Sequence, residues 1–519
     1  MNFHLECARA GLFIAALALA GCGGGGGGGG SSTTTPPPPV AGAYLDATVY
    51  SSQPTAGLSN PNEITSVTHG QALIGATALN YTATTGHLTA LGLADNSPQA
   101  SFFYVAYTLD GAAPATRPVT FFYNGGPGSS TIWLHLGSFG PKRLDTGEPN
   151  MSGMAPFPLV DNAESLLDVS DLVFVDAVGS GFSEAILPNV NRTFWGVDVD
   201  GAVFRDFIRR YIAVNNRASS PKFLYGESYG GPRTAVIADL LEASGTRLSG
   251  IVLQSPALNY NSNCGIIVAV VSCGGYLPTY GATAAWFGKA SPPVSVAQIP
   301  EFMNQLRPLT DNEYSPAVVA FLTMATRPDP LLVTRLAAAS GLTPAQWDAN
   351  FNMSPEFFRV NLQPGTVSGR YDARVTLPNN SPPGREIDPS DVLISPSFSL
   401  RLGEYLVGPL GYTNPSTYTM LSNAINFWNF SHDGNPLPDT LPDLAAAIAQ
   451  NPGLKVLAVN GYHDMATPFH TTERDLARLG SNPNVRVINY IGGHMTYLEN
   501  SSRRAMKANL AQFYGSATQ

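Results

Sequence analysis

Charged residues are scarce in this sequence, and no segment concentrates the positive ones. Asp, Glu, Lys and Arg make up 13% of the 519 residues, and the formal net charge is -9. Without a Lys/Arg-rich block the chain lacks the positive surface that nucleic-acid binding requires, so we expect no nucleic acid among its partners. Hydrophobic residues reach 44%. This fraction excludes a largely disordered chain and allows a sizeable core.

Cysteine is rare as well, with four residues in the chain. None stands at a Cys/His spacing typical of zinc sites, and we expect neither a metal nor a cofactor. Two of the four lie in the first 22 residues, which leaves Cys264 and Cys273 for the body of the protein. In an exported protein such a pair can form a disulfide, and the alternative is two buried thiols. We expect the disulfide.

The N-terminal apolar run is short. It covers residues 10–20, which are too few to span a bilayer but fit a signal peptide. Leu19-Ala20-Gly21-Cys22 ends the run and resembles the lipobox of bacterial lipoproteins, where cleavage precedes a cysteine that carries lipid. The alternative is a plain signal peptide with an incidental cysteine. We expect residues 1–22 to direct export and the lipid on Cys22 to anchor the protein to the bacterial outer membrane, as its only membrane contact.

Low-complexity sequence separates this segment from the rest. Residues 23–43 hold an unbroken glycine run, then Ser and Thr, then a short proline run, a composition typical of a tether. From residue 44 to 519 the pattern is that of a globular domain. Within it, residues 257–400 are rich in Pro and Asn and poor in buried strands, and we expect them to form an inserted cap. No internal repeats are visible.

The globular part alternates strand-like and helix-like segments. Strands are predicted from β-branched, aromatic or continuous apolar runs at 71–81, 100–109, 118–123, 171–176, 222–226, 249–254, 454–459 and 485–490. Helical spacing of apolar residues is found at 197–212, 233–241 and 502–514. Strands and helices in alternation predict an α/β protein with a mostly parallel sheet and helices on both faces.

A serine stands in a distinctive turn. Gly226-Glu227-Ser228-Tyr229-Gly230 fits the pattern G-x-S-x-G and lies between a predicted strand and a predicted helix. That context is typical of a nucleophile elbow, a sharp turn that leaves the serine hydroxyl exposed. We therefore expect Ser228 to be a catalytic nucleophile, and an ordinary Gly-Ser turn is the alternative.

A catalytic triad places an acid and then a base after such a serine, each behind a strand. Asp464 and His494 follow the last two predicted strands, and His494 stands behind two glycines. His463 is a rival base, although it directly precedes Asp464. Asp388 is a rival acid, although no strand precedes it. The sequence predicts that Ser228, His494 and Asp464 hydrolyse an amide or ester.

A glycine-rich stretch, YNGGPGSS at residues 123–130, directly follows another predicted strand. Its backbone N–H groups can point into a cleft and stabilise an oxyanion, with one more N–H from the residue after the nucleophile. A phosphate-binding loop is the competing interpretation. It fails because no Lys follows at the required spacing.

Four motifs, taken in order, resemble the serine carboxypeptidase family (peptidase family S10). They are NGGPGSS at 124–130, FVD at 174–176 with GSGFS at 179–183, GESYGG at 226–231 and GGHM at 492–495. The resemblance implies an α/β-hydrolase that removes C-terminal residues from peptides through an acyl-enzyme. Its partners would be peptides with a free C-terminus.

The resemblance also implies roles for single residues. Ser228, Asp464 and His494 again form the triad, and the backbone amides of Gly126 and Tyr229 form the oxyanion hole.

Substrate binding is implied for a second group of residues. Asn124, Gly125 and Glu227 would help to bind the substrate, with Asn124 and Glu227 at its terminal carboxylate. Met495 would lie beside the leaving residue.

The sequence departs from the family pattern at three places. Phe122 stands where a Trp is common, and Ser129 replaces a cysteine of a family disulfide. Ser138 stands where a Glu usually partners Glu227. With no like charge there, we expect Glu227 to ionise more easily and to repel a substrate carboxylate as the pH rises, unless a cation intervenes. His135 is a candidate for that cation, although we prefer to interpret it as a buried histidine.

Three functions follow from these observations. A serine carboxypeptidase is the one we expect. An esterase or acyltransferase would use the same elbow and oxyanion loop, and the altered carboxylate site supports it. A lipid-anchored binding protein without activity is disfavoured by the complete triad. The sequence does not predict the oligomeric state.

Overall fold

The computed structural model describes residues 43–150, 155–266, 271–379 and 388–518. The expected signal peptide, the lipidation at Cys22 and the tether up to residue 42 lie outside the described residues. Within the described ranges, no helix combines the length and the apolar character that crossing a membrane requires.

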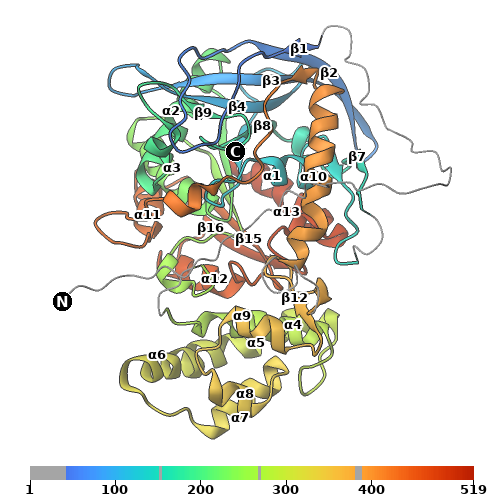
Figure 1. Cartoon of the computed structure of the whole chain (residues 1–519), viewed down its shortest axis with the longest axis vertical. Coiled ribbons are helices and arrows are strands. Elements are labelled where there is room, and N and C mark those ends of the chain that lie inside the picture. The colour runs from blue at the N-terminus through green and yellow to red at the C-terminus, as the bar shows by residue number, and fades with distance from the viewer. Residues whose placement is uncertain (1–42, 151–154, 267–270, 380–387, 519) are drawn as a thin grey trace, which may run out of the picture.

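A ten-stranded sheet forms the centre of the molecule (Figure 1). Its strands are β2 (Thr65–Ile74), β3 (Thr77–Leu91), β4 (Pro98–Leu109), β5 (Val119–Tyr123), β8 (Asp171–Val175), β9 (Glu184–Ala185), β10 (Lys222–Glu227), β11 (Gly250–Gln254), β15 (Lys455–Gly461) and β16 (Val485–Tyr490). They lie in the order β16-β15-β11-β10-β5-β8-β4-β3-β2, with β9 beside β4. Neighbours from β16 to β8 are parallel, and β4, β3 and β2 continue the sheet antiparallel. The run predicted as strand at 71–81 contains the turn between β2 and β3, at Gly75.

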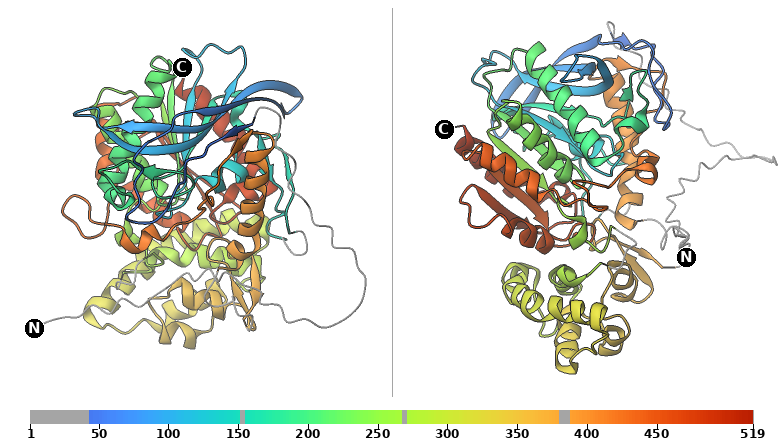
Figure 2. Two further views of the ribbon diagram at one scale, coloured as in Figure 1. Left: turned by 45° about the horizontal axis from the view of Figure 1, so that its top comes forward. Right: turned by 90° about the vertical axis from the view of Figure 1, so that its left-hand side faces the viewer.

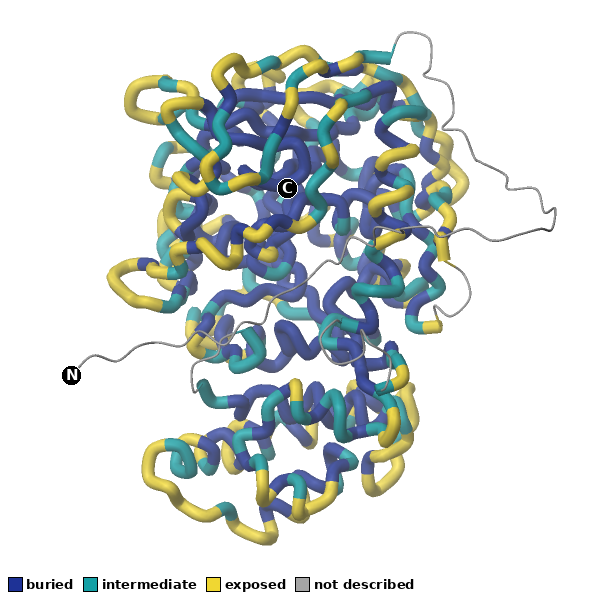
Figure 3. Tube along the Cα trace, in the orientation of Figure 1, coloured by how far each residue is buried: buried dark blue, intermediate teal, exposed yellow. Residues whose placement is uncertain are grey.

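Helices cover both faces of the sheet (Figure 2). On one face lie α2 (Val197–Val214), α3 (Gly230–Ala243) and α11 (Leu441–Gln450), and on the other α1 (Ile132–Gly137), α10 (Pro389–Val407) and α13 (Asn500–Ala517). Alternate strand residues divide between the two cores: Phe223 and Tyr225 face α13, and Leu224 faces α2 and α3. The central strands are therefore buried on both faces, as Figure 3 shows, and this explains their continuous apolar sequences. The predicted architecture, an α/β-hydrolase fold, is confirmed.

Between β11 and β15 the chain forms a helical insertion. Its elements are α4 (Leu277–Trp286), α5 (Ile299–Leu309), α6 (Ser315–Met324), α7 (Pro330–Ser340), α8 (Pro344–Ala349), α9 (Pro355–Asn361), β12 (Thr366–Ser368) and β13 (Thr376–Pro378). The helices share a core of their own and form the lower body in Figure 1. They occupy the range in which we expect a cap. The helix α10 begins in the same range but packs on the main domain, where the rings of Phe398 and Trp133 lie 4.9 Å apart.

Short elements complete the main domain. They are β1 (Tyr44–Leu45), which pairs with β14 (Tyr412–Thr413), β6 (Lys142–Leu144), which pairs with β7 (Leu159–Asp161), and α12 (Phe469–Ala477), which follows β15. Because β5, β10, β11, β15 and β16 are parallel neighbours, the loops after their carboxyl ends meet at one edge of the sheet. Every residue predicted for catalysis lies on one of these loops or directly beside it.

Candidate active site

Ser228 lies in the sharp turn between β10 and α3. Its φ of 64° is in the left-handed region, which a residue with a side chain adopts only where its surroundings hold it. Backbone hydrogen bonds supply that support: Ser228 N donates to Gln254 O at 2.9 Å, and Gly231 N donates to Ser228 O at 2.9 Å. A Cβ at Gly226 would lie 2.2 Å from Gly230 O, so only glycine fits there. This is the geometry of a nucleophile elbow.

His494 and Asp464 form a buried pair. Nδ1 of His494 lies 2.8 Å from Oδ2 of Asp464, and the two residues are 4% and 0% exposed. Asp464 Oδ1 accepts from the N–H groups of Ala466 and Thr467 at 2.8 and 3.0 Å, and the Thr467 hydroxyl donates to Oδ2 at 2.8 Å. Burial disfavours the imidazolium, but the adjacent Asp464 carboxylate outweighs it and raises the pKa of His494. The carboxylate thus orients the imidazole and stabilises its charged form.

Contacts through β11 bring His494 to the strand ends that carry Ser228. The carbonyl of His494 accepts from Ser255 Oγ at 2.8 Å and from Gln254 Nε2 at 3.1 Å. Gln254 is also the residue whose carbonyl holds the amide of Ser228. The loops after β10, β15 and β16 are therefore joined at one point, and the predicted nucleophile, acid and base lie on these three loops.

The two rivals have other positions. His463 is completely buried, neither of its ring nitrogens has a partner among the described residues, and burial lowers its pKa to about 3. It is therefore a neutral histidine, next to Trp286 at 5.7 Å between rings. Asp388 caps the N-terminus of α10, where it accepts from the N–H groups of Ser390 and Asp391 at 2.9 and 3.3 Å.

The glycine-rich loop after β5 packs directly on the elbow. A Cβ on Gly125 would lie 2.4 Å from Tyr229 N and 2.7 Å from Glu227 O, so only glycine allows the two backbones to approach. In the described part of the chain, the N–H groups of Gly126 and Tyr229 donate to no protein acceptor. Two free donors beside the elbow are what an oxyanion requires.

Glu227, the residue before the nucleophile, is buried and hydrogen-bonded through both oxygens. Asn124 Nδ2 donates to Oε1 at 3.0 Å, and the phenol of Tyr497 donates to Oε2 at 2.6 Å. Asn124 is itself held by Leu134 N, which donates to Oδ1 at 3.0 Å. Burial raises the pKa of Glu227 to about 7, against the lowering effect of His494. We expected Glu227 to ionise more easily because position 138 carries no like charge, but burial, with a smaller contribution from the Asp464 charge, still disfavours its anion.

Position 138 supplies neither a carboxylate nor a cation to Glu227. Ser138 is fully buried, and its hydroxyl donates to Leu134 O at 2.5 Å. His135 stacks on Phe174 at 4.7 Å between rings and bonds the hydroxyl of Tyr107 at 2.7 Å. Burial lowers the pKa of His135 to about 3, so the buried-histidine interpretation is confirmed and the ring supplies no cation.

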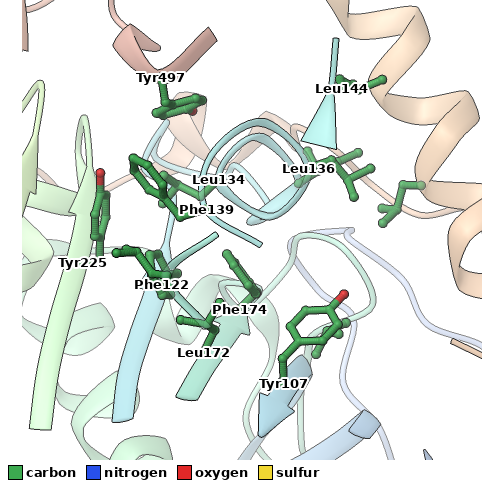
Figure 4. Close-up of a cluster of buried hydrophobic side chains, with 14 of the residues drawn as sticks. Tyr107, Phe122, Leu134, Leu136, Phe139, Leu144, Leu172, Phe174, Tyr225 and Tyr497 are labelled. Carbon is green, nitrogen blue, oxygen red and sulfur yellow. The ribbon is translucent and has the colours of Figure 1, made fainter. Parts of the chain in front are cut away.

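Tyr497 is the site residue that sequence reasoning missed. It is completely buried, and Figure 4 shows its ring in the aromatic cluster with Leu134 and Phe139. A tyrosine two residues after Met495 is as consistent with a core position as with a polar role, so the sequence carried no signal for it. Met495 itself is buried at 9% exposure, directly after the base.

The disulfide expected between Cys264 and Cys273 is present, with an S–S distance of 2.17 Å.

One His/Asp group was not predicted from the sequence. The possible ligand atoms of His432, Asp433 and Asp443 lie within 4.8 Å of one another. Its histidine is held by Asp198 at 2.6 Å and Asp443 at 2.9 Å, and these hydrogen bonds raise its pKa although burial opposes them. The two hydrogen-bonded carboxylates thus favour the charged form of this imidazole.

Known proteins resemble this chain in sequence. Residues 75–269 match the family model described as serine carboxypeptidase, a stretch that includes the oxyanion loop and the elbow and ends before Asp464. Among curated proteins, serine carboxypeptidase-like 33 from Arabidopsis thaliana is 29% identical over 153 residues, which are 27% of this chain. The matched part spans 28% of the length of that relative.

The fold has a solved counterpart. The crystal structure of Kex1(delta)p, a prohormone-processing carboxypeptidase from Saccharomyces cerevisiae, superposes with a TM-score of 0.52 at 15% identity and covers 84% of this chain and 91% of its own. At that identity the likeness shows a shared α/β-hydrolase fold. Together with the family model, these matches support the serine carboxypeptidases as the family of this chain and a hydrolase as its class.

Proposed function

We propose that this protein is a serine carboxypeptidase, which hydrolyses the C-terminal peptide bond of its substrates. Ser228 Oγ attacks the carbonyl carbon while His494 accepts its proton, and the backbone N–H groups of Gly126 and Tyr229 stabilise the oxyanion. His494 then passes the proton to the leaving amine, which departs as the free C-terminal residue. Water, deprotonated by His494, hydrolyses the acyl-Ser228 and restores the enzyme. Asp464 keeps the imidazole oriented throughout.

The observation that carries this proposal is the environment of Glu227. Its carboxyl group adjoins the nucleophile, is held by Asn124 and Tyr497, and has a pKa raised by burial to about 7. In its protonated form the group can donate a hydrogen bond to a substrate carboxylate. An esterase or acyltransferase acting on uncharged esters has no need for such a carboxyl group beside its elbow.

The test uses the purified protein and one N-blocked dipeptide as its free acid, its amide and its methyl ester at pH 5–8. We expect release of the C-terminal amino acid from the free acid, with a higher kcat/KM than for the amide at acidic pH. Ser228→Ala should lower kcat roughly 10⁴-fold or more and abolish labelling by a fluorophosphonate. Ser244→Ala, at the end of α3, is the matched control. Hydrolysis of the ester without release of any amino acid would instead indicate an esterase.

We further propose that the protein is exported and held at the outer membrane by lipid on Cys22. Support comes from the short apolar run, the residues Leu19-Ala20-Gly21-Cys22 and the tether that follows.

A further inference from the structure

Arg370 lies in the turn between β12 and β13, at the point where the insertion touches the triad loops. Its carbonyl accepts from Met465 N at 3.0 Å, directly after Asp464. The next carbonyl, of Tyr371, accepts from His494 N at 2.6 Å, and the Tyr371 ring lies 5.2 Å from the imidazole. This segment therefore joins the loop of the acid to the loop of the base.

The guanidinium of Arg370 forms no ion pair within the described residues. Nη2 donates to Gly265 O at 2.9 Å, and Nε is buried without a partner. Nη1 has no protein acceptor either and is not among the buried atoms, so it reaches solvent. The ring of Tyr371 lies 5.8 Å from the guanidinium carbon. Burial opposes the charge, but Glu356 and Asp388 are near enough to help raise the pKa of Arg370, although neither carboxylate is in hydrogen-bond contact with its guanidinium. The charge is therefore held in the fold without a direct ion pair.

A neighbouring arginine shows the usual arrangement. The guanidinium nitrogens of Arg374 lie 2.6 Å, 3.4 Å and 4.0 Å from carboxylate oxygens of Asp372, Glu499 and Glu148, so its charge is balanced within the protein.

Asp388 does not form such an ion pair with the side chain of Arg370. Its carboxylate accepts from the backbone N–H groups of Arg370 and Tyr371 and from Ser390, and it lies 3.8 Å from the guanidinium of Arg359. Of the Arg370 side-chain nitrogens, Nη1 is therefore the one available to an anion from outside, because Nη2 donates to Gly265 O and Nε is buried.

We propose that Arg370 binds a carboxylate of the peptide substrate next to the scissile bond. The inference rests on the proposed function and names a substrate class for it, peptides with an acidic residue at the cleavage site. A guanidinium binds a carboxylate by charge-assisted hydrogen bonds, often two at once. Glu227 lies at the end of β10 and Asn124 directly after β5, whereas Arg370 lies on a separate segment, the turn between β12 and β13, which contacts the loops of Asp464 and His494. This separation favours a side-chain carboxylate of the substrate, and the terminal carboxylate is the other source of the same chemistry.

The experiment uses two pairs of N-blocked dipeptides, with Glu or Gln at the C-terminal position and with Glu or Gln at the position before it. Each peptide is tested as free acid and amide. The test variants are Arg370→Gln and Arg370→Lys. Arg359→Gln is the matched control, because Arg359 lies nearby on α9 and its Nε donates to Ser368 O at 2.7 Å. The rate of fluorophosphonate labelling reports on Ser228 and His494 without the substrate carboxylate.

For the wild type we expect kcat/KM to favour Glu over Gln roughly 10- to 100-fold in one of the pairs. Arg370→Gln should remove the preference, Arg370→Lys should keep part of it, and Arg359→Gln all of it. Because Arg370 lowers the pKa of His494, labelling rates are compared at a pH where His494 is neutral in every variant, and there they should agree. If Arg370→Gln instead weakens every free acid and spares the amides, the ligand is the terminal carboxylate, which also supports the proposal.

Two outcomes would overturn it. In the first, the wild type has the same kcat/KM for the Glu and the Gln peptide of each pair, and Arg370→Gln leaves the ratio of kcat/KM between free acid and amide unchanged. The second is an equal loss for all substrates and for labelling in both Arg370 variants, which would mean that the residue only supports the His494 loop. If no peptide of any sequence releases an amino acid while labelling proceeds, the proposed function fails and not merely this inference.

Discussion

The phenol of Tyr497 donates a 2.6 Å hydrogen bond to Oε2 of Glu227, and both residues are buried. Burial raises the pKa of Tyr497 well above its ordinary value, so the phenol keeps its proton throughout the physiological range. A neutral donor, and not a second carboxyl group, therefore orients Glu227. The geometry of the pair does not depend on a proton shared between two acids.

The pH dependence of substrate binding follows from the pKa of Glu227. In the proposed function the protonated carboxyl of Glu227 donates to a substrate carboxylate, and its anion would repel one. Because burial raises this pKa from its ordinary value to about 7, the favourable form is present below about pH 7 and is lost as the pH rises through that value. We expect the KM of a free-acid dipeptide to rise above pH 7 while the KM of its amide changes little. Parallel curves for the two substrates would contradict this account.

Tyr497→Phe should move that transition. The phenol lowers the pKa of Glu227 by hydrogen bonding to its anion, so removing the hydroxyl should raise the pKa further. The rise in KM should then begin at a higher pH than in the wild type, and the variant should lose about 1 kcal/mol of stability. Tyr514→Phe is the control, because its buried hydroxyl bonds Thr120 at 2.8 Å. A KM curve that stays in place would show that the phenol does not tune Glu227.

Asp464 and Asp388 can be told apart by matched substitutions. Asp464→Asn removes the charge that orients His494 and should lower kcat roughly 10⁴-fold. Asp388→Asn keeps one acceptor oxygen for the N-cap of α10 but turns an NH₂ group toward the N–H groups of Arg370 and Tyr371, so stability should fall by about 1–3 kcal/mol while kcat stays far above that of Asp464→Asn. Steady-state kinetics and thermal unfolding of both variants check this. A collapse of activity in Asp388→Asn alone would reverse the assignment.

The lipid anchor is tested by fractionation. We expect the full-length protein to sediment with the outer membrane and Cys22→Ser either to be released in soluble form or to remain unprocessed. Cys7→Ser, within the segment that cleavage removes, is the control and should leave the anchor intact. A mature-sized Cys22→Ser protein that still sediments with membranes would mean that something other than lipid holds it.

The disulfide should contribute modestly to stability. The bridge closes a loop with a sequence separation of 9, for which loop entropy predicts roughly 2–3 kcal/mol. Cys273→Ser should therefore lower the free energy of unfolding by about that amount. Thiol titration of the unfolded, unreduced protein should find neither Cys264 nor Cys273 free. Two free thiols in an oxidised preparation would exclude the bridge.

Local patterns predicted the sheet well, because strands buried on both faces are continuous apolar runs and the elbow and oxyanion loop have dense glycine signatures. What they could not predict depends on residues distant in sequence. The low pKa of His135 comes from its packing against Phe174 and Tyr107, and the raised pKa of Glu227 comes from burial. No sequence motif surrounds Arg370, and its segment lies beside the His494 loop only because of the path that the insertion takes.

That path has a consequence for how the protein folds. The serine precedes the insertion and both of its partners follow it, so the site forms only after the chain has closed a very long loop between β11 and β15. Closing such a loop costs conformational entropy before the contacts between its ends can form, and this cost slows folding. During refolding from denaturant, helical circular dichroism should therefore return before fluorophosphonate reactivity. Synthesis on the ribosome has the same order: the elbow emerges early and stays chemically idle until the last two strands of the sheet have been made.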